Sequence, residues 1–362
     1  MQVNNLNLVN FRNYDKLNLD FSPKKNIIIG KNGMGKTNIV EALFVLAFTK
    51  SFRGQTDGIL IKKDCDFLKV DADIKSTFID NYKIVISNDD KRVNINNNRV
   101  KKLSEYVSKI NVILFSIDDL KLIKDTPSTR RKLINMELSQ LDNEYLCLLN
   151  NYNKLVKQRN SYLKTLMYNG YASKQYLEVL TNNIIDYGIK IFEFRKKFIN
   201  DINCLIKDIY FKISKSDSLF VKYVSDYDLS REQIKEKYIK YEEKDINFGK
   251  THFGVHHDDF IFFKDDTNLK DYGSEGEQKN AIIAFKLAEL EMFKNIRGNY
   301  PILILDDLFS ELDREKINNI LSYISDDVQT FITTTELSKV KRKIVRDSKV
   351  FIVDNGIVEE KI

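Results

Sequence analysis

The sequence is poor in cysteine and proline, and it has no apolar run long enough to cross a membrane. Its 362 residues contain three prolines and three cysteines: Cys65, Cys147 and Cys204. These cysteines are isolated, odd in number and without the spacing of metal ligands, which argues against a disulfide framework and favours a reduced, cytoplasmic protein. The first residues lack the apolar segment of a signal peptide, and no stretch of about 18 apolar residues occurs, so we expect no membrane span.

Neither sign of charge is in large excess. Lysine and arginine together number 58 and the acidic residues 52, which gives a net charge of +6. This mildly basic balance permits an acidic partner such as nucleic acid but does not require one. The length and the 43% apolar content are sufficient for two domains and at least one sizeable core.

The sequence does contain a glycine-rich loop between a short apolar run and a longer apolar stretch. The segment GKNGMGKTN, residues 30–38, matches the pattern G-x-x-x-x-G-K-[ST] at a strand-to-helix turn. Backbone N–H groups of such a loop, with the start of the helix, form a cradle for phosphate. Lys36 would reach the β- and γ-phosphates of ATP, and the Thr37 hydroxyl would bind Mg²⁺. The residues predicted to bind ATP are Gly30, Lys31, Asn32, Gly33, Met34, Gly35, Lys36, Thr37 and Asn38.

A second candidate strand supplies the carboxylates that such a loop needs. In PILILDDLFSELD, residues 301–313, the apolar residues 302–305 are typical of a strand buried on both faces. Asp306 would hold Mg²⁺, and Asp307 would orient or deprotonate the attacking water. An aspartate at position 307 is one methylene shorter than a glutamate, from which we expect slow hydrolysis.

A seven-residue repeat predicts a helical hairpin in the middle of the chain. It indicates one helix over residues 134–166, a turn at residues 168–170, and a second helix over residues 177–198, folded back on the first. Arg159 is the single polar residue in the seam. The seam residues of the first helix are Ile134, Leu138, Leu141, Tyr145, Leu148, Tyr152, Leu155, Arg159, Tyr162 and Leu166, and those of the second are Leu177, Leu180, Ile184, Tyr187, Ile191, Phe194 and Phe198.

This predicted arm carries most of the net charge. Residues 129–210 contain 13 basic and 8 acidic residues, a difference of +5. A solvated helix face explains any single cluster equally well, but for the arm as a whole we favour contact with a phosphate backbone. The candidate DNA contacts are Arg53, Arg130, Arg131, Lys132, Arg195, Lys196 and Lys197.

The segment DYGSEGEQKN, from residue 271, places Ser274 and Gly276 just before a long helix. One ATP is unlikely to require two complete phosphate cradles from one chain. We therefore expect Ser274 of one copy to close on the nucleotide held by a second copy.

In combination these motifs resemble those of the RecF family, ATPases of the ABC class that are related to SMC proteins. The resemblance covers nearly the whole chain, and the combination of its segments is highly specific. The segments are LVNFRNYDKLNLDFSPKKNIIIGKNGMGKTNIVEAL, SFR, LFSIDDLKLIKDTPSTRRKLI, YNKLVKQRN, GVHHDDF, SEGEQKN and LDDLFSELD.

The resemblance implies an α/β fold, namely an ABC-type P-loop ATPase head with an inserted α-helical hairpin arm. The head would contain a mixed sheet with flanking helices and an antiparallel β subdomain, to which the alternating residues near the N-terminus and around residues 83–96 would contribute. It would comprise residues 1–126 and 212–362, and the arm residues 127–211. By position, Ser274 and Gly276 are the signature that acts in trans. The loop that crosses the dimer interface is Ser310, Glu311, Leu312 and Asp313.

The resemblance also implies a function in recombinational repair and replication-fork maintenance. The protein would be an ATP-induced homodimer that binds double-stranded DNA and single-strand/duplex junctions near gaps. With RecR and RecO it would promote RecA loading and SOS induction. Slow, DNA-stimulated ATP hydrolysis would act as a release switch in the cytoplasm, without a membrane partner.

Some positions depart from the family pattern. Ile117 and Val255 replace prolines, and His257 replaces an arginine, while His256, Asp258 and Asp259 match without a role that the sequence explains. His252 lies close to His256 and His257, but no cysteine accompanies them, so we do not favour a metal site. In FITTTE, residues 331–336, Thr334 or Thr335 is expected where ABC transporters carry a switch histidine.

Three other readings compete with the DNA-binding switch. A transporter subunit predicts a switch histidine and no basic hairpin, whereas this chain shows the reverse. A phosphotransferase needs neither a signature serine nor a heptad arm. A DNA clamp that binds ATP without hydrolysis is disfavoured, though not excluded, by the Asp306–Asp307 pair.

Overall fold

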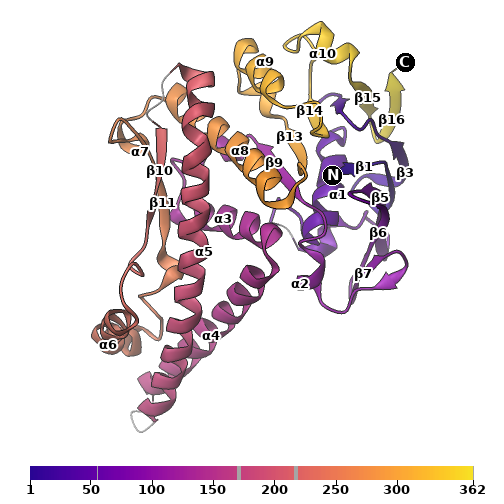
Figure 1. The fold of residues 1–362 in the computed structure, drawn as a ribbon. Coiled ribbons are helices and arrows are strands. Elements are labelled where there is room, and N and C mark those ends of the chain that lie inside the picture. The colour runs from indigo at the N-terminus through magenta and orange to yellow at the C-terminus, as the bar shows by residue number, and fades with distance from the viewer. Residues whose placement is uncertain (55, 169–172, 216–218, 362) are drawn as a thin grey trace. The chain divides into compact units, whose positions relative to one another are not determined.

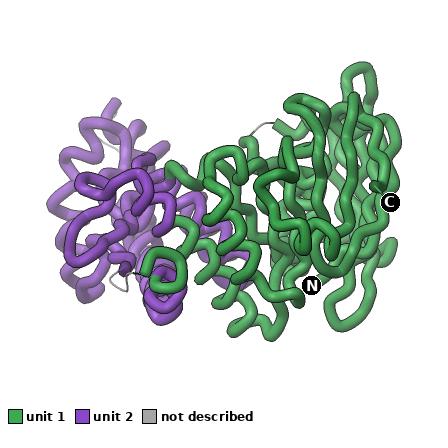
Figure 2. Tube along the Cα trace, turned by 90° about the horizontal axis from the view of Figure 1, so that it is seen from above, with its two compact units in different colours: residues 1–121, 211–215, 282–362 green, residues 122–210, 216–281 purple. Residues whose placement is uncertain are grey.

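The computed structural model describes residues 1–54, 56–168, 173–215 and 219–361. The chain forms two compact units, which Figure 2 shows in two colours. The first unit comprises Met1–Lys121, Phe211–Lys215 and Ile282–Ile362, and the second Leu122–Tyr210 and Ser216–Ala281. Segments from both ends of the chain therefore fold into the first unit, as the spacing of the phosphate loop and the acidic strand requires.

A mixed six-stranded sheet forms the centre of the first unit (Figure 1). All neighbouring strands are parallel except the last pair, β15 and β16. Three of its central strands are buried along almost their whole length, as expected of parallel strands that are covered on both faces. In spatial order the strands are β16 (Ile357–Lys361), β15 (Lys349–Asp354), β4 (Lys25–Ile29), β14 (Thr330–Thr334), β13 (Ile302–Asp306) and β9 (Val112–Ser116).

An antiparallel sheet forms the other part of the first unit. Along β5 buried and less buried residues alternate, as expected of a strand with one covered face. Helix α1 (Lys36–Phe48) packs against strands of both sheets, which explains why residues 39–47 are all buried and, apart from Glu41, apolar. The strands are β1 (Gln2–Val3), β2 (Asn5–Phe11), β3 (Tyr14–Asp20), β5 (Phe67–Lys75), β6 (Ile79–Ser87), β7 (Lys91–Ile95) and β8 (Asn98–Arg99).

Short helices connect these strands. They are η1 (Asp57–Leu60), α2 (Leu103–Tyr106), η2 (Asp118–Lys121), η4 (Leu308–Ser310), α9 (Arg314–Tyr323) and α10 (Arg342–Arg346). The long helix α8 (Glu275–Arg297) begins in the second unit and ends in the first. The predicted head architecture, a mixed sheet with flanking helices and an antiparallel β subdomain, is confirmed.

The second unit contains more than the predicted helical arm. Strands β10 and β11 pair antiparallel, and the rest of residues 219–281 folds with the helices, so the unit does not end at the expected residue 211. No described helix is long and apolar enough to span a bilayer. The elements are α3 (Pro127–Leu141), α4 (Asn143–Tyr168), α5 (Lys174–Ser214), β10 (Leu219–Val224), α6 (Arg231–Phe248), η3 (Val255–His257), β11 (Asp259–Lys264), β12 (Thr267–Asn268) and α7 (Leu269–Tyr272).

The first arm helix is interrupted, contrary to the sequence-based expectation of one helix over residues 134–166. Asp142 has an extended backbone between α3 and α4. Its carboxylate accepts the N–H of Glu144 at 2.7 Å. An aspartate that bonds to a nearby N–H in this way caps a new helix rather than continuing the old one. The seven-residue repeat of apolar residues continues through the break, because the repeat depends on which residues are buried and not on whether the helix is continuous. The turn expected at residues 168–170 lies largely outside the described residues.

Arg159, the polar residue in the seam, is buried and hydrogen-bonded to three polar side chains. Its guanidinium donates to Asp245 at 2.7 Å, to Thr251 at 2.8 Å and to Thr181 at 3.0 Å. It also lies 5.4 Å from the ring centre of Tyr238. A buried charge is tolerated when it is paired and hydrogen-bonded in this way. Arg159 therefore joins α4 to α5 and α6 in place of an apolar contact.

Candidate functional site

The glycine-rich loop joins β4 to α1 at the carboxyl end of the parallel strands. Gly33 and Gly35 have φ angles of 83° and 113°, a region that favours glycine. A Cβ atom on Gly35 would also lie 2.6 Å from the Asn13 amide and 2.7 Å from the Tyr14 hydroxyl. Helix α1 has no acidic residue in its first turn. The partial positive charge at its N-terminus is therefore available to a phosphate group.

Lys36 is held inside this loop. Its Nζ donates to the carbonyl of Lys31 at 2.9 Å. Burial lowers the pKa of Lys36, while the nearby Asp307 and Asp306 oppose that shift. A negative ligand in the loop would favour the charged ammonium. The attraction between Lys36 and a bound phosphate would therefore offset the free energy that burial of the ammonium costs.

Asp306 ends β13 and accepts hydrogen bonds from two different elements. The Thr37 hydroxyl, at the start of α1, donates to it at 3.0 Å, and the Thr333 hydroxyl, from β14, at 2.7 Å. Burial is the main cause that raises the pKa of Asp306, and both bonds act in the opposite direction. A carboxylate and a hydroxyl this close are oxygen ligands of the kind that Mg²⁺ prefers. The pair fits Mg²⁺, with Asp306 and Thr37 as its protein ligands.

Asp307 follows with a left-handed backbone, at φ 50°. Its N–H donates to the Thr333 hydroxyl at 2.9 Å. Burial raises the pKa of Asp307, and the charge of Lys36 lowers it in part. A carboxylate with a raised pKa beside the phosphate loop can orient a water molecule or accept its proton.

Thr333 is a site residue that sequence reasoning missed. The sequence analysis placed the switch threonine at Thr334 or Thr335. The Thr334 hydroxyl instead donates to the Glu336 carbonyl at 3.0 Å. Strand β14 lies between β4 and β13, and in this register Thr333 pairs with Asp306. Only the strand order reveals this pairing, because the three threonines are consecutive and chemically equivalent in the sequence.

The turn between β2 and β3 forms hydrogen bonds with the phosphate loop and the start of α1. The Asn13 side chain donates to the Met34 carbonyl at 3.3 Å and accepts from Asn38 at 2.7 Å. Arg53 donates to Asn38 at 3.2 Å, and its guanidinium lies 3.6 Å from the buried Glu41. These contacts place Arg53, a predicted DNA contact, beside the phosphate loop.

The signature residues begin α8 within the second unit. Ser274 and Glu277 form a reciprocal cap, since the Ser274 N–H and hydroxyl both donate to the Glu277 carboxylate, at 2.9 Å and 2.8 Å. Lys264 donates to the same carboxylate at 2.7 Å and is the main cause that lowers the pKa of Glu277 to about 2. A Cβ atom on Gly276 would meet nothing within 4 Å. The start of α8 is therefore a preformed, exposed turn.

The loop expected at a dimer interface follows Asp307. Ser310 and Glu311 are exposed, whereas Leu312 is buried and anchors the loop. Asp313 caps α9 by accepting the N–H of Lys316 at 2.8 Å. The polar side chains of this loop are therefore presented to solvent from a fixed backbone.

Two of the predicted DNA contacts are buried. Arg130 is 3% exposed and donates to both oxygens of Asp259, at 2.6 Å and 2.8 Å. Arg195 is 2% exposed and donates to Asp258 at 3.1 Å. Neither guanidinium lies on the outer surface. We therefore remove Arg130 from the predicted set, and Arg195 reaches solvent only as part of the lining of a pocket. The sequence gave no sign of this because a basic cluster looks the same whether it faces solvent or a buried carboxylate.

These ion pairs explain the GVHHDDF segment, whose role the sequence left open. Asp258 also accepts hydrogen bonds from Tyr223 and Ser225. Burial lowers the pKa of His256 to about 4, so its ring is neutral at pH 7 and hydrogen-bonds to the Tyr152 hydroxyl at 2.8 Å. Among the described residues, no group of three or more acidic, histidine or cysteine side chains could hold a metal ion. The segment therefore joins α3, α4 and α5 to the three-stranded sheet of β10, β11 and β12.

Together the sheet order and the loop chemistry define an ATPase head of the ABC class. Residues 2–359 match the family described as the RecF/RecN/SMC N terminal domain. SMC head domains, including one from Pyrococcus furiosus, share the fold at 16% identity and TM-scores of 0.55 and 0.56.

Within that class the chain belongs to the RecF family. It is 36% identical to the DNA replication and repair protein RecF of Latilactobacillus sakei, over 99% of both chains. It is 37% identical to RecF of Bacillus subtilis, over 98% of this chain and 99% of the relative. The solved structure of the recombination mediator protein RecF-ATP in the RecFOR pathway has a TM-score of 0.90 at 29% identity, over 100% of this chain and 98% of the other.

Proposed function

We propose that this chain is an ATP-driven switch that controls binding to DNA during recombinational repair and replication-fork maintenance. The observation that carries the proposal is the group of Thr37, Asp306 and Thr333, which joins the phosphate loop to the acidic strand through one shared carboxylate. The family relationship supports it, because the relatives are named replication and repair proteins and one was solved with ATP.

In this proposal the residues of the phosphate loop bind ATP, and Asp306 and Asp307 bind Mg²⁺ and activate water, respectively. Backbone N–H groups of residues 30–38 hold the phosphates of ATP, and Lys36 neutralises the β- and γ-phosphates. Bound Mg²⁺ would supply further neutralisation of phosphate charge at Thr37 and Asp306. Asp307 orients the attacking water and accepts its proton. Its short side chain accounts for slow turnover, which suits a timer better than a metabolic enzyme.

A second copy of the chain completes the site. The phosphate loop and the Ser274 turn belong to different units, and the start of α8 is exposed and preformed. Ser274 and Gly276 of one copy would close on the γ-phosphate held by another, and residues 310–313 would cross the interface. Because the γ-phosphate then lies between copies, its hydrolysis would release them.

The DNA partner would be double-stranded DNA and single-strand/duplex junctions near gaps. The dimer would act with RecR and RecO to promote RecA loading and SOS induction, in the cytoplasm. The proposal is tested by sedimentation with and without ATP and a gapped duplex. It requires ATP to promote dimers and the duplex to stimulate hydrolysis; a chain that stays monomeric in all four conditions contradicts it.

Replacing Thr333 with valine should lower the hydrolysis rate about tenfold or more with little change in the KM for ATP. Valine keeps the shape of the side chain but leaves Asp306 without one donor and the Asp307 N–H without its acceptor. The loss of such a buried hydrogen bond costs about 1–3 kcal/mol. Because the two lost bonds position Asp306 and Asp307, both carboxylates should be held less precisely. Steady-state kinetics with separate kcat and KM values measure the effect.

The matched control is Thr330→Val on the same strand, since Thr330 is also buried and its hydroxyl bonds to the Val328 carbonyl at 3.2 Å. Thr333→Ser restores the hydroxyl and should restore kcat. Equal kcat values for Thr333→Val, Thr330→Val and the unmodified chain would show that Thr333 positions nothing.

DNA binding should weaken by about tenfold or more between 50 and 200 mM salt, because neutralised phosphates release counterions. Exposed lysines on α5 test the contribution of the arm. Lys190→Ala together with Lys197→Ala should reduce the slope of log affinity against log salt by about two, one unit for each phosphate contact. Fluorescence anisotropy with a labelled duplex measures both quantities.

The control pair is Lys235→Ala with Lys237→Ala. These lysines of α6 are half-buried and already paired with Glu178 and Asp226, at 2.8 Å and 3.1 Å. Their loss should change the slope less. An affinity independent of salt would exclude phosphate contact as the source of DNA binding, and equal slopes for both pairs would exclude this face of α5.

A further inference from the structure

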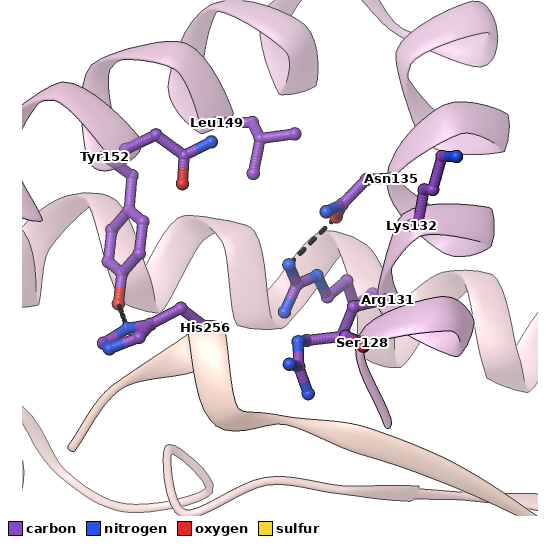
Figure 3. A pocket seen from close by; sticks show the side chains of 9 residues that line it. Ser128, Arg131, Lys132, Asn135, Leu149, Tyr152 and His256 are labelled. Carbon is purple, nitrogen blue, oxygen red and sulfur yellow. Dashed lines mark hydrogen bonds between the residues drawn. The ribbon is translucent and has the colours of Figure 1, made fainter. Parts of the chain in front are cut away.

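A pocket of about 320 Å³ opens within the second unit, between α3, α4, α5 and η3 (Figure 3). Arg131, Lys132 and Asn135 reach it from α3, Tyr152 from α4, and Arg195 from α5. We propose that this pocket binds one phosphate group of a nucleic-acid strand. The proposal rests on the proposed function only in naming DNA as the source of that phosphate.

The lining of the pocket is strongly positive. Three of its side chains are cations, and no carboxylate lines it among the described residues. Arg195 is compensated by Asp258, which does not line the pocket. Arg131 bonds to a backbone carbonyl, that of Asp258, at 2.7 Å. Lys132 has no ion-pair partner within the described part of the chain. The aspartates nearest to Arg131, Asp258 and Asp259, already form ion pairs with Arg195 and Arg130.

The backbone adds to this positive potential. Ser128, at the start of α3, also lines the pocket, and the first turn of this 15-residue helix has no acidic residue. Cations near a helix N-terminus are unfavourable because they meet the positive end of the helix dipole. Arg131 and Lys132 lie in the second turn of α3, so their charges add to the positive potential of the helix start, and a bound anion would offset both.

The donors of the pocket are fixed before any ligand arrives. Arg195 is held by the Tyr145 hydroxyl at 3.0 Å, the Val255 carbonyl at 2.7 Å and Asn135 at 2.9 Å. The Asn135 Oδ1 accepts from both Arg195 and Tyr145, which determines the orientation of its amide. Its –NH₂ end has no acceptor among the described residues and can donate to a ligand. Preorganised donors of this kind increase affinity by avoiding ordering costs.

The chemistry selects phosphate over a carboxylate or a metal ion. The guanidinium and ammonium groups only donate, and the Asn135 Oδ1 is already bonded to Arg195 and Tyr145, so the positive lining disfavours a cation. Arginine matches the oxygen spacing of phosphate, and several donors around one tetrahedral group satisfy more than two oxygens. The volume is at the low end for a ligand site and suits a phosphate with its attached sugar. The lowered pKa of His256, to which the charges of Arg131 and Arg195 contribute, agrees with a positive local potential.

The test uses the full chain with its phosphate loop saturated by ADP and Mg²⁺, so that inorganic phosphate can report on the pocket alone. Titration calorimetry at constant ionic strength measures phosphate binding. Arg131→Ala with Lys132→Ala should weaken it about tenfold or more, whereas Arg131→Lys with Lys132→Arg keeps the charges and should retain most of it. Lys154→Ala with Lys157→Ala, two exposed lysines of α4 outside the pocket, is the control and should change nothing.

A second arm identifies the source of the phosphate. A duplex oligonucleotide should displace inorganic phosphate from the unmodified chain and do so less well from Arg131→Ala with Lys132→Ala. If phosphate binds at the pocket but no oligonucleotide displaces it, the ligand is a free phosphate and the assignment to DNA is wrong. If the ADP-saturated chain binds no phosphate, or the alanine pair binds it equally well, the pocket proposal fails. Failure of the proposed function appears separately, as absent DNA binding by the unmodified chain.

Discussion

The Lys36→Met chain should remain monomeric at ATP concentrations that convert the unmodified chain to dimers. Lys36 is the one side chain of the loop that neutralises the β- and γ-phosphates, and in this proposal the γ-phosphate joins the two copies. A charge-assisted hydrogen bond to phosphate is worth about 1.5–3 kcal/mol, so nucleotide affinity should fall by about tenfold to a hundredfold. Sedimentation velocity with ATP, Mg²⁺ and a gapped duplex measures the dimer.

Misfolding would not explain this result. Burial lowers the pKa of Lys36, which means that the folded chain disfavours its charge. Methionine has a similar length and no charge to bury, so the ATP-free variant should unfold at the same temperature as the unmodified chain or higher. Lys31→Met, which changes an exposed lysine of the same loop, is the matched control. Dimers that form as readily with Lys36→Met as without it would disprove the coupling of ATP to association.

Changing Asp307 to asparagine should reduce ATP hydrolysis by about a hundredfold or more, the usual contribution of a general base. ATP should still bind, because Lys36, Thr37 and Asp306 are unchanged. The dimer should therefore last longer than that of the unmodified chain, since release waits for hydrolysis. Single-turnover hydrolysis and the lifetime of the dimer after removal of free ATP measure the two effects.

Asparagine suits this test because it is among the few residues that tolerate the left-handed backbone seen at position 307. Any loss then reflects the missing carboxylate and not a distorted strand end. Glu315→Gln, at an exposed carboxylate at the start of α9, is the control for the change in charge. Unchanged hydrolysis by Asp307→Asn would assign the base elsewhere, and rapid dissociation of an Asp307→Asn dimer would disconnect release from hydrolysis.

Local patterns were sufficient for the architecture of the head. The run at residues 302–305 is apolar because both faces of its strand are covered. The alternating residues of β2 and β6 follow the two faces of a half-covered sheet. The cap of α6 has an equally local basis, since Ser230 and Gln233 form the two reciprocal hydrogen bonds of a capping box. Each of these signals depends on residues within a few positions of one another.

Positions that depend on a partner distant in the chain could not be read in this way. Asp142 interrupts a regular heptad pattern, because the pattern records burial and not the local hydrogen bond that starts α4. Arg130 and Arg195 lie in basic clusters but turn inward to aspartates 129 and 63 residues away. A cluster of basic residues in the sequence indicates a positively charged surface only when its side chains are not paired with buried carboxylates.

The sequence by itself determined the phosphate loop, the acidic strand and the apolar faces, because glycine conformation, strand burial and helix periodicity are properties of neighbouring residues. Only the tertiary structure decided that Thr333, and not Thr334 or Thr335, bonds to Asp306, because that choice follows from the insertion of β14 between β4 and β13. It likewise decided which cations pair with buried aspartates and which line a pocket, since charges meet through space and not along the chain.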